Sequence, residues 1–160
     1  MAKIKVLFVC LGNICRSPLA EALFKHKVSK QGLTNLIEAD SCGTSNYHIG
    51  DWPDERTLVN ALQNGIEMDH RGRQITYTDL EKFDFVFAMD RSNYENIMQL
   101  ANAETHKHKV SLMRSFDLEN ENADVPDPYY GGARGFQDVF EILDRSTENF
   151  LEYIQKNHLK

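Results

Sequence analysis

The sequence predicts an α/β fold in which helices cover a parallel β-sheet. Short apolar runs, as expected for buried strands, alternate with longer segments of helical periodicity. This alternation is typical of parallel sheets, because the chain must cross over between two parallel strands. A length of 160 residues, with 41% hydrophobic and 26% charged residues, is ordinary for one globular domain. We therefore expect a single domain that spans residues 1–160.

Four apolar runs are the predicted strands, at residues 4–9, 36–39, 83–89 and 110–113. The run at 36–39 is the weakest of the four. The run at 4–9 is too brief for the core of a signal peptide and leads directly into a turn that contains glycine. We therefore interpret it as a buried strand.

Helices are predicted between and after these strands. The first begins near Ser17 and Pro18, because serine can cap a helix and proline fits the first turn, and it ends near Gly32. Two more are predicted over residues 53–64 and 91–101. The last helix has the clearest pattern, with apolar residues at spacings of three, four and seven: Phe136, Val139, Phe140, Leu143, Phe150, Leu151 and Ile154.

Residues 119–128 are acidic and lack periodicity, which predicts a long loop within the domain. The net charge of -6 disfavours broad binding of nucleic acids or of anionic membranes. No segment of the sequence is apolar and long enough to cross a bilayer. Three cysteines are too few for a disulfide framework and indicate a reducing compartment, so we expect a cytoplasmic protein.

The segment from Cys10 to Ser17 lies between a predicted strand and a predicted helix. Five residues separate Cys10 from Arg16, which is enough for backbone N–H groups to surround a tetrahedral anion at the start of the helix. The same donors and the Arg16 guanidinium would stabilise a Cys10 thiolate, while the planar fork of Arg16 can grip two phosphoryl oxygens. Gly12 is expected to permit backbone conformations that a side chain would obstruct. The Gly-Lys-Ser/Thr ending of a nucleotide-binding Walker loop is absent from this segment.

A cysteine and an arginine six residues apart would by themselves more often be a packing thiol and a surface cation. The strand, glycine, serine and proline around them favour a phosphate-binding loop with a nucleophile. The loop, together with motifs before and after it in the chain, closely resembles the low-molecular-weight protein tyrosine phosphatase family. These motifs are Val6-Leu7-Phe8-Val9, Asp40-Ser41, Gly43-Thr44, Ala88-Met89-Asp90, Ser92-Asn93 and Asp127-Pro128-Tyr129-Tyr130.

The resemblance spans essentially the whole chain. It implies a four-stranded parallel sheet flanked by helices on both faces, in a flavodoxin-like three-layer arrangement. It also implies a phosphocysteine mechanism in which Cys10 is the nucleophile, Arg16 clamps the phosphate and Asp127 is the general acid and base. No cofactor and no metal are expected.

Further residues are assigned by the same resemblance. The loop that binds the phosphate comprises Leu11, Gly12, Asn13, Ile14, Cys15 and Ser17. Asn13, Ser17, Ser41 and His70 are expected to hold this loop rigid. Tyr47, His48, Tyr129 and Tyr130 are expected around the entrance, where aromatic walls would favour phosphotyrosine over phosphoserine.

The expected partners are tyrosine-phosphorylated proteins, with a tyrosine kinase as a further candidate. The chain is expected to be a monomer or to associate weakly with itself. In a subset of the family, the counterpart of Cys15 forms a reversible disulfide with the nucleophile, which suggests that Cys10 and Cys15 are a redox pair. Cys42 is interpreted as a small buried filler, and His106 and His108 as exposed loop residues without a metal.

Two other functions remain open at this point. Arsenate reductases use a related loop but pass oxidation to a distal cysteine pair, whereas Cys42 is the only cysteine beyond the loop. A non-catalytic phosphotyrosine-binding module would need only the anion-binding loop and the aromatic walls. The presence of both Cys10 and Asp127 favours an enzyme.

Overall fold

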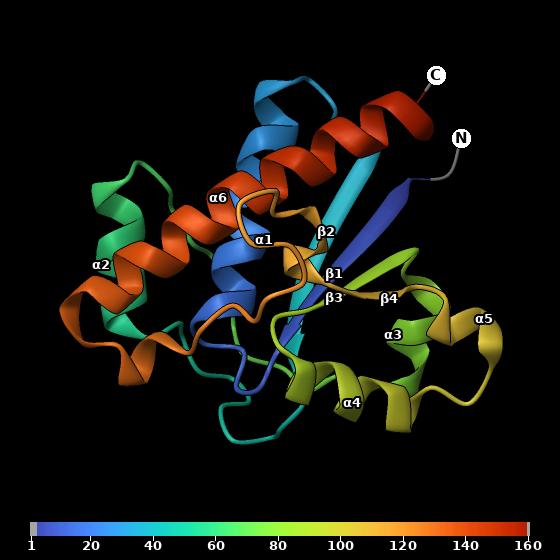
Figure 1. Ribbon diagram of the computed structural model, residues 1–160, viewed down its shortest axis with the longest axis horizontal. Helices are drawn as coiled ribbons and strands as arrows, with labels where there is room; N and C mark the ends of the chain where they lie inside the picture. Colours follow the sequence, from blue (N-terminus) through green and yellow to red (C-terminus); the bar gives the residue numbers. More distant parts are fainter. Residues whose placement is uncertain (1–2, 160) are drawn as a thin grey trace.

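The computed structural model describes residues 3–159, which form a four-stranded parallel sheet with helices on both faces (Figure 1). The strands are β1 (Ile4–Cys10), β2 (Ile37–Gly43), β3 (Phe85–Ala88) and β4 (Val110–Leu112). Their order in the sheet is β2-β1-β3-β4, so β1 pairs with both β2 and β3. The predicted fold class and the four predicted strands are confirmed. The predicted domain limits at residues 1 and 160 lie outside the described residues.

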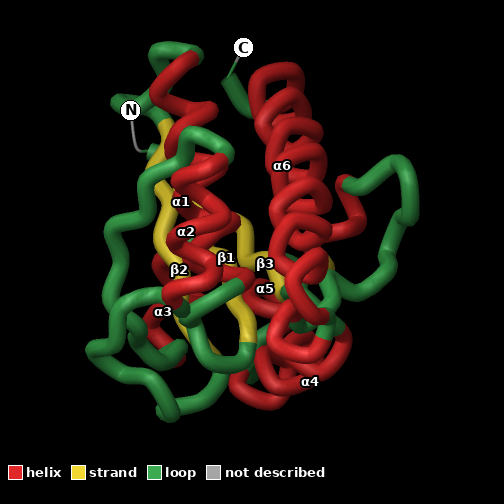
Figure 2. Tube along the Cα trace, turned by 90° about the vertical axis from the view of Figure 1, so that its left-hand side faces the viewer, coloured by secondary structure: helices red, strands yellow, loops and turns green. Residues whose placement is uncertain are grey.

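The side chains of β1 alternate between two apolar cores. Val6 and Phe8 belong to the core beneath helices α1 (Arg16–Lys30) and α6 (Gly132–Asn157), which run side by side in Figure 2. Leu7 and Val9 belong to the second core, beneath α3 (Tyr77–Lys82) and α4 (Arg91–Leu100). Because residues 6–10 of β1 are buried on both faces, this part of the strand is continuously apolar rather than alternating. Helix α2 (Glu55–Gln63) lies on the side of α1, since its Ala61 belongs to the first core.

Strand β2 is longer than predicted and continues from residue 39 to Gly43. In this extension Ser41 lies opposite Phe8 and Cys42 lies opposite Val9 of β1. Small and polar residues carry no apolar pattern, so the sequence did not indicate that they are buried strand residues. Cys42 is fully buried, as predicted for a filler.

Two helix starts differ from the prediction. Helix α1 begins at Arg16, and Cys15 occupies its N-cap position without a side-chain hydrogen bond. Ser17 therefore lies in the first turn, and the prediction that it caps the helix is wrong. Helix α2 begins at Glu55 rather than at residue 53, because the Asp54 carboxylate caps it by accepting a hydrogen bond from the Arg56 N–H.

The short helices were not predicted, because they span too few residues to show periodicity. They are α3, α5 (Glu104–Lys107) and the 3-10 turns η1 (Met113–Phe116) and η2 (Pro128–Tyr130). His106 in α5 is buried and packs edge-on against Tyr77, so the prediction that it is an exposed loop residue is wrong. His108 is exposed, as predicted. Across residues 3–159, no helix is both long enough and apolar enough to span a membrane.

Candidate active site

The loop after β1 holds the Cys10 thiol at the start of α1. Cys10 is only 3% exposed, yet it lines a cavity of about 520 Å³. Its Sγ lies 2.9 Å from the Ser17 hydroxyl oxygen and accepts a hydrogen bond from the Asn13 N–H at 3.3 Å. Both groups can donate to a negatively charged sulfur. The loop thus offers a thiolate two stabilising partners at the end of the central strand.

Asn13, rather than Gly12, is the loop residue in the left-handed region, with φ of 58°. Gly12 has a different constraint, because a Cβ atom there would lie 3.0 Å from His48 Cδ2. This close approach agrees with the expectation that a side chain at Gly12 would be obstructed. Asparagine is one of the few residues that tolerate the left-handed conformation, provided that its side chain is held locally.

The Asn13 side chain makes four such contacts. Its Nδ2 donates to Ser17 Oγ at 2.8 Å and to Ser41 Oγ at 3.0 Å. Its Oδ1 lies 2.7 Å from His70 Nε2 and accepts a hydrogen bond from the Arg73 N–H at 3.0 Å. The four residues expected to support the loop, namely Asn13, Ser17, Ser41 and His70, are thus brought together. Their side chains contact one another and do not line the cavity.

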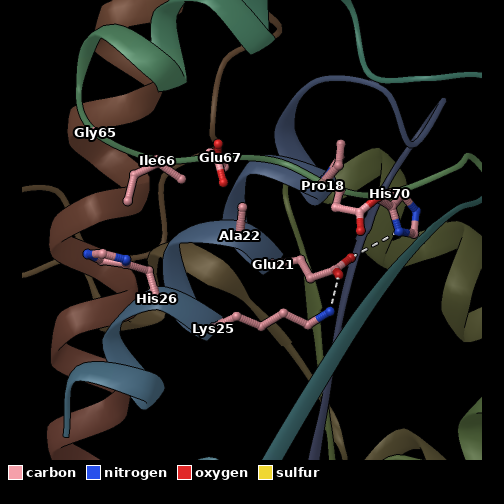
Figure 3. Close-up of a pocket in the computed structure, with 10 residues that line it drawn as sticks. Pro18, Glu21, Ala22, Lys25, His26, Gly65, Ile66, Glu67 and His70 are labelled. Carbon is pink, nitrogen blue, oxygen red and sulfur yellow. Dashed lines mark hydrogen bonds and ion pairs between the residues drawn. The ribbon is translucent and has the colours of Figure 1, made fainter.

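A second tier of charged groups surrounds this network and was not predicted. The buried Glu21 carboxylate lies 3.2 Å from His70 Nδ1 and pairs with Lys25 (Figure 3). It also accepts a hydrogen bond from Ser41 Oγ at 2.7 Å. Glu21 follows Ser17 by four residues on α1, so helical spacing could have indicated that the two share a face.

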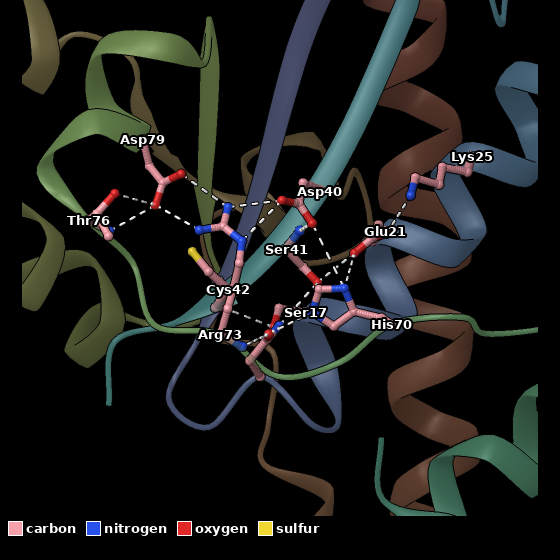
Figure 4. Close-up of polar contacts among 11 residues, drawn as sticks. Ser17, Glu21, Lys25, Asp40, Ser41, Cys42, His70, Arg73, Thr76 and Asp79 are labelled. Atoms are coloured by element: carbon pink, nitrogen blue, oxygen red, sulfur yellow. Dashed lines mark hydrogen bonds and ion pairs between the residues drawn. The ribbon is translucent and has the colours of Figure 1, made fainter. Parts of the chain in front are cut away.

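Arg73 forms the other half of this tier (Figure 4). Its guanidinium donates to Asp40 at 3.1 Å and to Asp79 at 2.9 and 3.1 Å. Potential metal-ligating atoms of Glu21, Asp40 and His70 lie within 4.8 Å of one another. Lys25 and Arg73 already pair with two of these groups, so the cluster is an ion-pair network that backs the loop.

Arg16 is almost fully buried at the first position of α1. Its Nη1 donates to Asp90 at 2.7 Å and to the Val125 carbonyl oxygen at 3.0 Å. Burial alone would lower the pKa of Arg16, but the neighbouring Cys10 and Asp90 raise it above its ordinary value. Within residues 3–159, no hydrogen bond engages Nε or Nη2 of Arg16. This edge of the guanidinium therefore remains available for two oxygens of a phosphate.

Asp127 lines the same cavity, although it lies far from Cys10 in the sequence. It precedes η2 and caps it, because its Oδ1 accepts a hydrogen bond from the Tyr129 N–H at 3.0 Å. This bond uses one carboxylate oxygen and leaves the second oxygen to reach a ligand. The cavity thus combines a thiol, a fixed cation and a carboxyl group.

Aromatic side chains surround the entrance of the cavity. Tyr47, Tyr129 and Tyr130 are 73%, 63% and 84% exposed, which leaves their rings free to contact a ligand. Asp54 also lines the cavity, although the sequence did not single it out. The full lining consists of Cys10, Leu11, Gly12, Ile14, Cys15, Arg16, Tyr47, His48, Asp54, Asp127, Tyr129 and Tyr130.

The comparisons with known proteins agree with this geometry. Residues 5–160 match the family model described as low molecular weight phosphotyrosine protein phosphatase. The chain belongs to this family. A Schizosaccharomyces pombe member, named low molecular weight phosphotyrosine protein phosphatase, is 45% identical over 152 residues, which cover 94% of this chain and 97% of the relative. The resemblance predicted from the motifs is confirmed, and this phosphatase is a hydrolase.

Two solved structures extend the comparison of this phosphatase with its relatives. The crystal structure of YfkJ from Bacillus subtilis is 39% identical, covers 99% of this chain and 98% of its own, and superimposes with a TM-score of 0.93. The crystal structure of a Drosophila arginine phosphatase is 34% identical, covers 96% of this chain and 99% of its own, and has a TM-score of 0.88.

Proposed function

We propose that this phosphatase hydrolyses phosphotyrosine in proteins through a phosphocysteine intermediate. The observation that carries the proposal is one cavity lined by Cys10, Arg16 and Asp127, with tyrosines at its rim. Residues 1–160 would act as one functional domain on tyrosine-phosphorylated proteins. The cytoplasm is the proposed location, where reductants keep a catalytic thiol free. We still expect the protein to be a monomer or to associate weakly with itself.

In the first step, the Cys10 thiolate attacks phosphorus and the bond to the tyrosyl oxygen breaks. Arg16 and the loop N–H groups hold the phosphoryl oxygens as their charge redistributes. Asp127, in its protonated form, transfers its proton to the departing oxygen. The products of this step are neutral tyrosine and phosphocysteine.

In the second step, water attacks the phosphocysteine and its proton passes to the Asp127 carboxylate. The bond between sulfur and phosphorus breaks, which releases inorganic phosphate and regenerates the thiolate. The Ser17 hydroxyl, 2.9 Å from Cys10 Sγ, is placed to donate to the departing sulfur. Asp127 then holds the proton for the next cycle.

The rim supports an aryl phosphate as the substrate. Tyr47, Tyr129 and Tyr130 can contact a phenyl ring that enters the cavity, whereas the short side chain of phosphoserine offers no ring to contact. Selectivity would therefore depend on aromatic contact, while the phosphate itself is gripped by the loop and Arg16.

The test uses one peptide that carries phosphotyrosine, phosphoserine or phosphoarginine, assayed in the presence of EDTA. We expect kcat/KM to be at least about tenfold higher for phosphotyrosine than for phosphoserine, because only the former contacts the aromatic rim. A higher kcat/KM for phosphoarginine than for phosphotyrosine would contradict the proposal. It would indicate an arginine phosphatase, like the Drosophila relative. Release of inorganic phosphate is the measurement.

We also propose that Cys15 protects Cys10 from irreversible oxidation. Peroxide would convert Cys10 to a sulfenic acid, which the Cys15 thiolate attacks with loss of water to form a disulfide. Burial raises the pKa of Cys15 to about 12, with a further contribution from Asp54. Cys15 is therefore largely protonated at neutral pH, and disulfide formation should accelerate as the pH rises from about 7 to 9.

The measurement is phosphatase activity after brief treatment with peroxide, before and after addition of dithiothreitol. We expect the wild type to recover its activity and Cys15→Ser to remain inactive. Irreversible loss in both proteins, at the same rate, would rule out the protective disulfide.

A further inference from the structure

The segment from Asp117 to Asp127, here called the acid loop, carries the proposed proton donor but contains no helix or strand. Its end near Asp127 is held by backbone contacts. The Val125 N–H donates to the Met89 carbonyl oxygen at 2.8 Å, and the Val125 carbonyl oxygen accepts from Arg16. The position of Asp127 therefore depends on the residues that fix this stretch of backbone.

Arg114, in η1, contacts the acid loop at three places. Its Nη1 donates to the Asp124 carbonyl oxygen at 2.9 Å, and its Nε donates to the Asp117 carboxylate at 2.8 Å. Its own carbonyl oxygen accepts a hydrogen bond from the Asn122 N–H at 2.9 Å. Arg114 is only 7% exposed, so these contacts are shielded from water.

Asp117 is fully buried, and its carboxylate holds the Arg114 guanidinium by accepting the hydrogen bond from Nε. Its carboxylate also accepts two hydrogen bonds from Arg145 of α6, at 2.8 and 3.0 Å. Burial alone would raise the pKa of Asp117, but hydrogen bonds from Arg145, the Glu119 N–H and Arg114 lower it below its ordinary value, so the carboxylate is ionised at neutral pH. A buried carboxylate with two arginine partners is a rigid anchor, because releasing either arginine would leave charge unpaired.

We propose that Arg114 is a positioning residue for Asp127. It links the buried Asp117 to the Asp124 carbonyl oxygen, three residues before Asp127. This link fixes the backbone of the acid loop and therefore the position of the Asp127 carboxyl group in the cavity. The inference rests on the proposed role of Asp127 as the proton donor. Without Arg114, the Asp124 carbonyl loses its side-chain donor and the loop has more freedom near the cavity.

The test compares two substrates that differ in their need for an acid. Phenyl phosphate has a poor leaving group and needs protonation, whereas 4-nitrophenyl phosphate has a good one and needs it much less. For Arg114→Gln we expect kcat/KM to fall about tenfold or more for phenyl phosphate, since small misplacements of a catalytic group cost up to about 100-fold. For 4-nitrophenyl phosphate the loss should stay below about threefold, because its departure depends little on the acid.

Arg145→Gln is the matched control. It removes an arginine from the same Asp117 carboxylate but not from the Asp124 carbonyl. We expect it to lower the melting temperature without changing the ratio of kcat/KM for the two substrates. If Arg114→Gln does not fold, Arg114→Lys serves instead, because lysine keeps the charge but cannot bridge both partners as a fork.

A double variant separates positioning from a general loss of structure. In an Asp127→Ala background, replacement of Arg114 should cause little further loss on phenyl phosphate, because no carboxyl group remains to be positioned. Three results would overturn the proposal: unchanged rates, equal losses on both substrates, or an undiminished loss without Asp127. If the wild type itself fails to hydrolyse phenyl phosphate, the proposed function fails instead.

Discussion

Cys10→Ser is expected to lower kcat for phosphotyrosine by on the order of 10⁴-fold or more, which is the scale seen when a catalytic nucleophile is removed. A serine hydroxyl at this position would remain protonated at neutral pH. In the first step of the proposed mechanism the Asp127 carboxyl group protonates the leaving group and does not activate a nucleophile. The substitution changes one atom, so the loop and Arg16 should still bind phosphate. The measurement is the rate of release of inorganic phosphate from a phosphotyrosine peptide.

Binding of the same peptide to the Cys10→Ser variant provides the control. Retained binding, measured by calorimetry, would show that the loop is intact and that only the chemistry is lost. If the wild type is as inert as the variant while both bind the peptide, the protein is a phosphotyrosine-binding module. The variant would also be suitable for capturing the physiological phosphoprotein.

Asp127→Ala is expected to lower kcat/KM for phenyl phosphate by about 10² to 10⁴-fold, the usual contribution of general acid catalysis. The effect should be much smaller for 4-nitrophenyl phosphate. Initial rates with both substrates provide the measurement.

Tyr130→Phe is a suitable control for that experiment, because Tyr130 lines the same cavity and is largely exposed. It should leave the difference between the substrates in place. An equal loss on both substrates in Asp127→Ala would assign the proton donor to another group.

The phosphate-binding loop could be predicted because it is local in the sequence. A buried strand, a short loop and a helix start follow one another, and that order alone places Cys10, Arg16 and the loop N–H groups together. Asp127 is different. It is separated from Cys10 by most of the chain, and only the resemblance to a known family singled it out.

Several residues that the sequence did not reveal have partners far along the chain. Arg73 pairs with Asp40, 33 residues before it, and Arg145 pairs with Asp117, 28 residues before it. No spacing rule connects residues so far apart. The left-handed conformation of Asn13 was not predicted either. Its side-chain partners include Ser41 and His70, which are distant in the sequence.

The contacts of Asn13 also bear on attempts to transplant this site. Its side chain is held by residues from α1, from β2 and from the segment that contains His70 and Arg73. The eight residues from Cys10 to Ser17, grafted onto another strand and helix, would retain Ser17 but lack Ser41, His70 and Arg73, the other partners of the Asn13 side chain. A designer would need to transfer α1, β2 and the segment with His70 and Arg73 together with the loop. The smallest unit that could be transplanted is therefore much larger than the sequence motif.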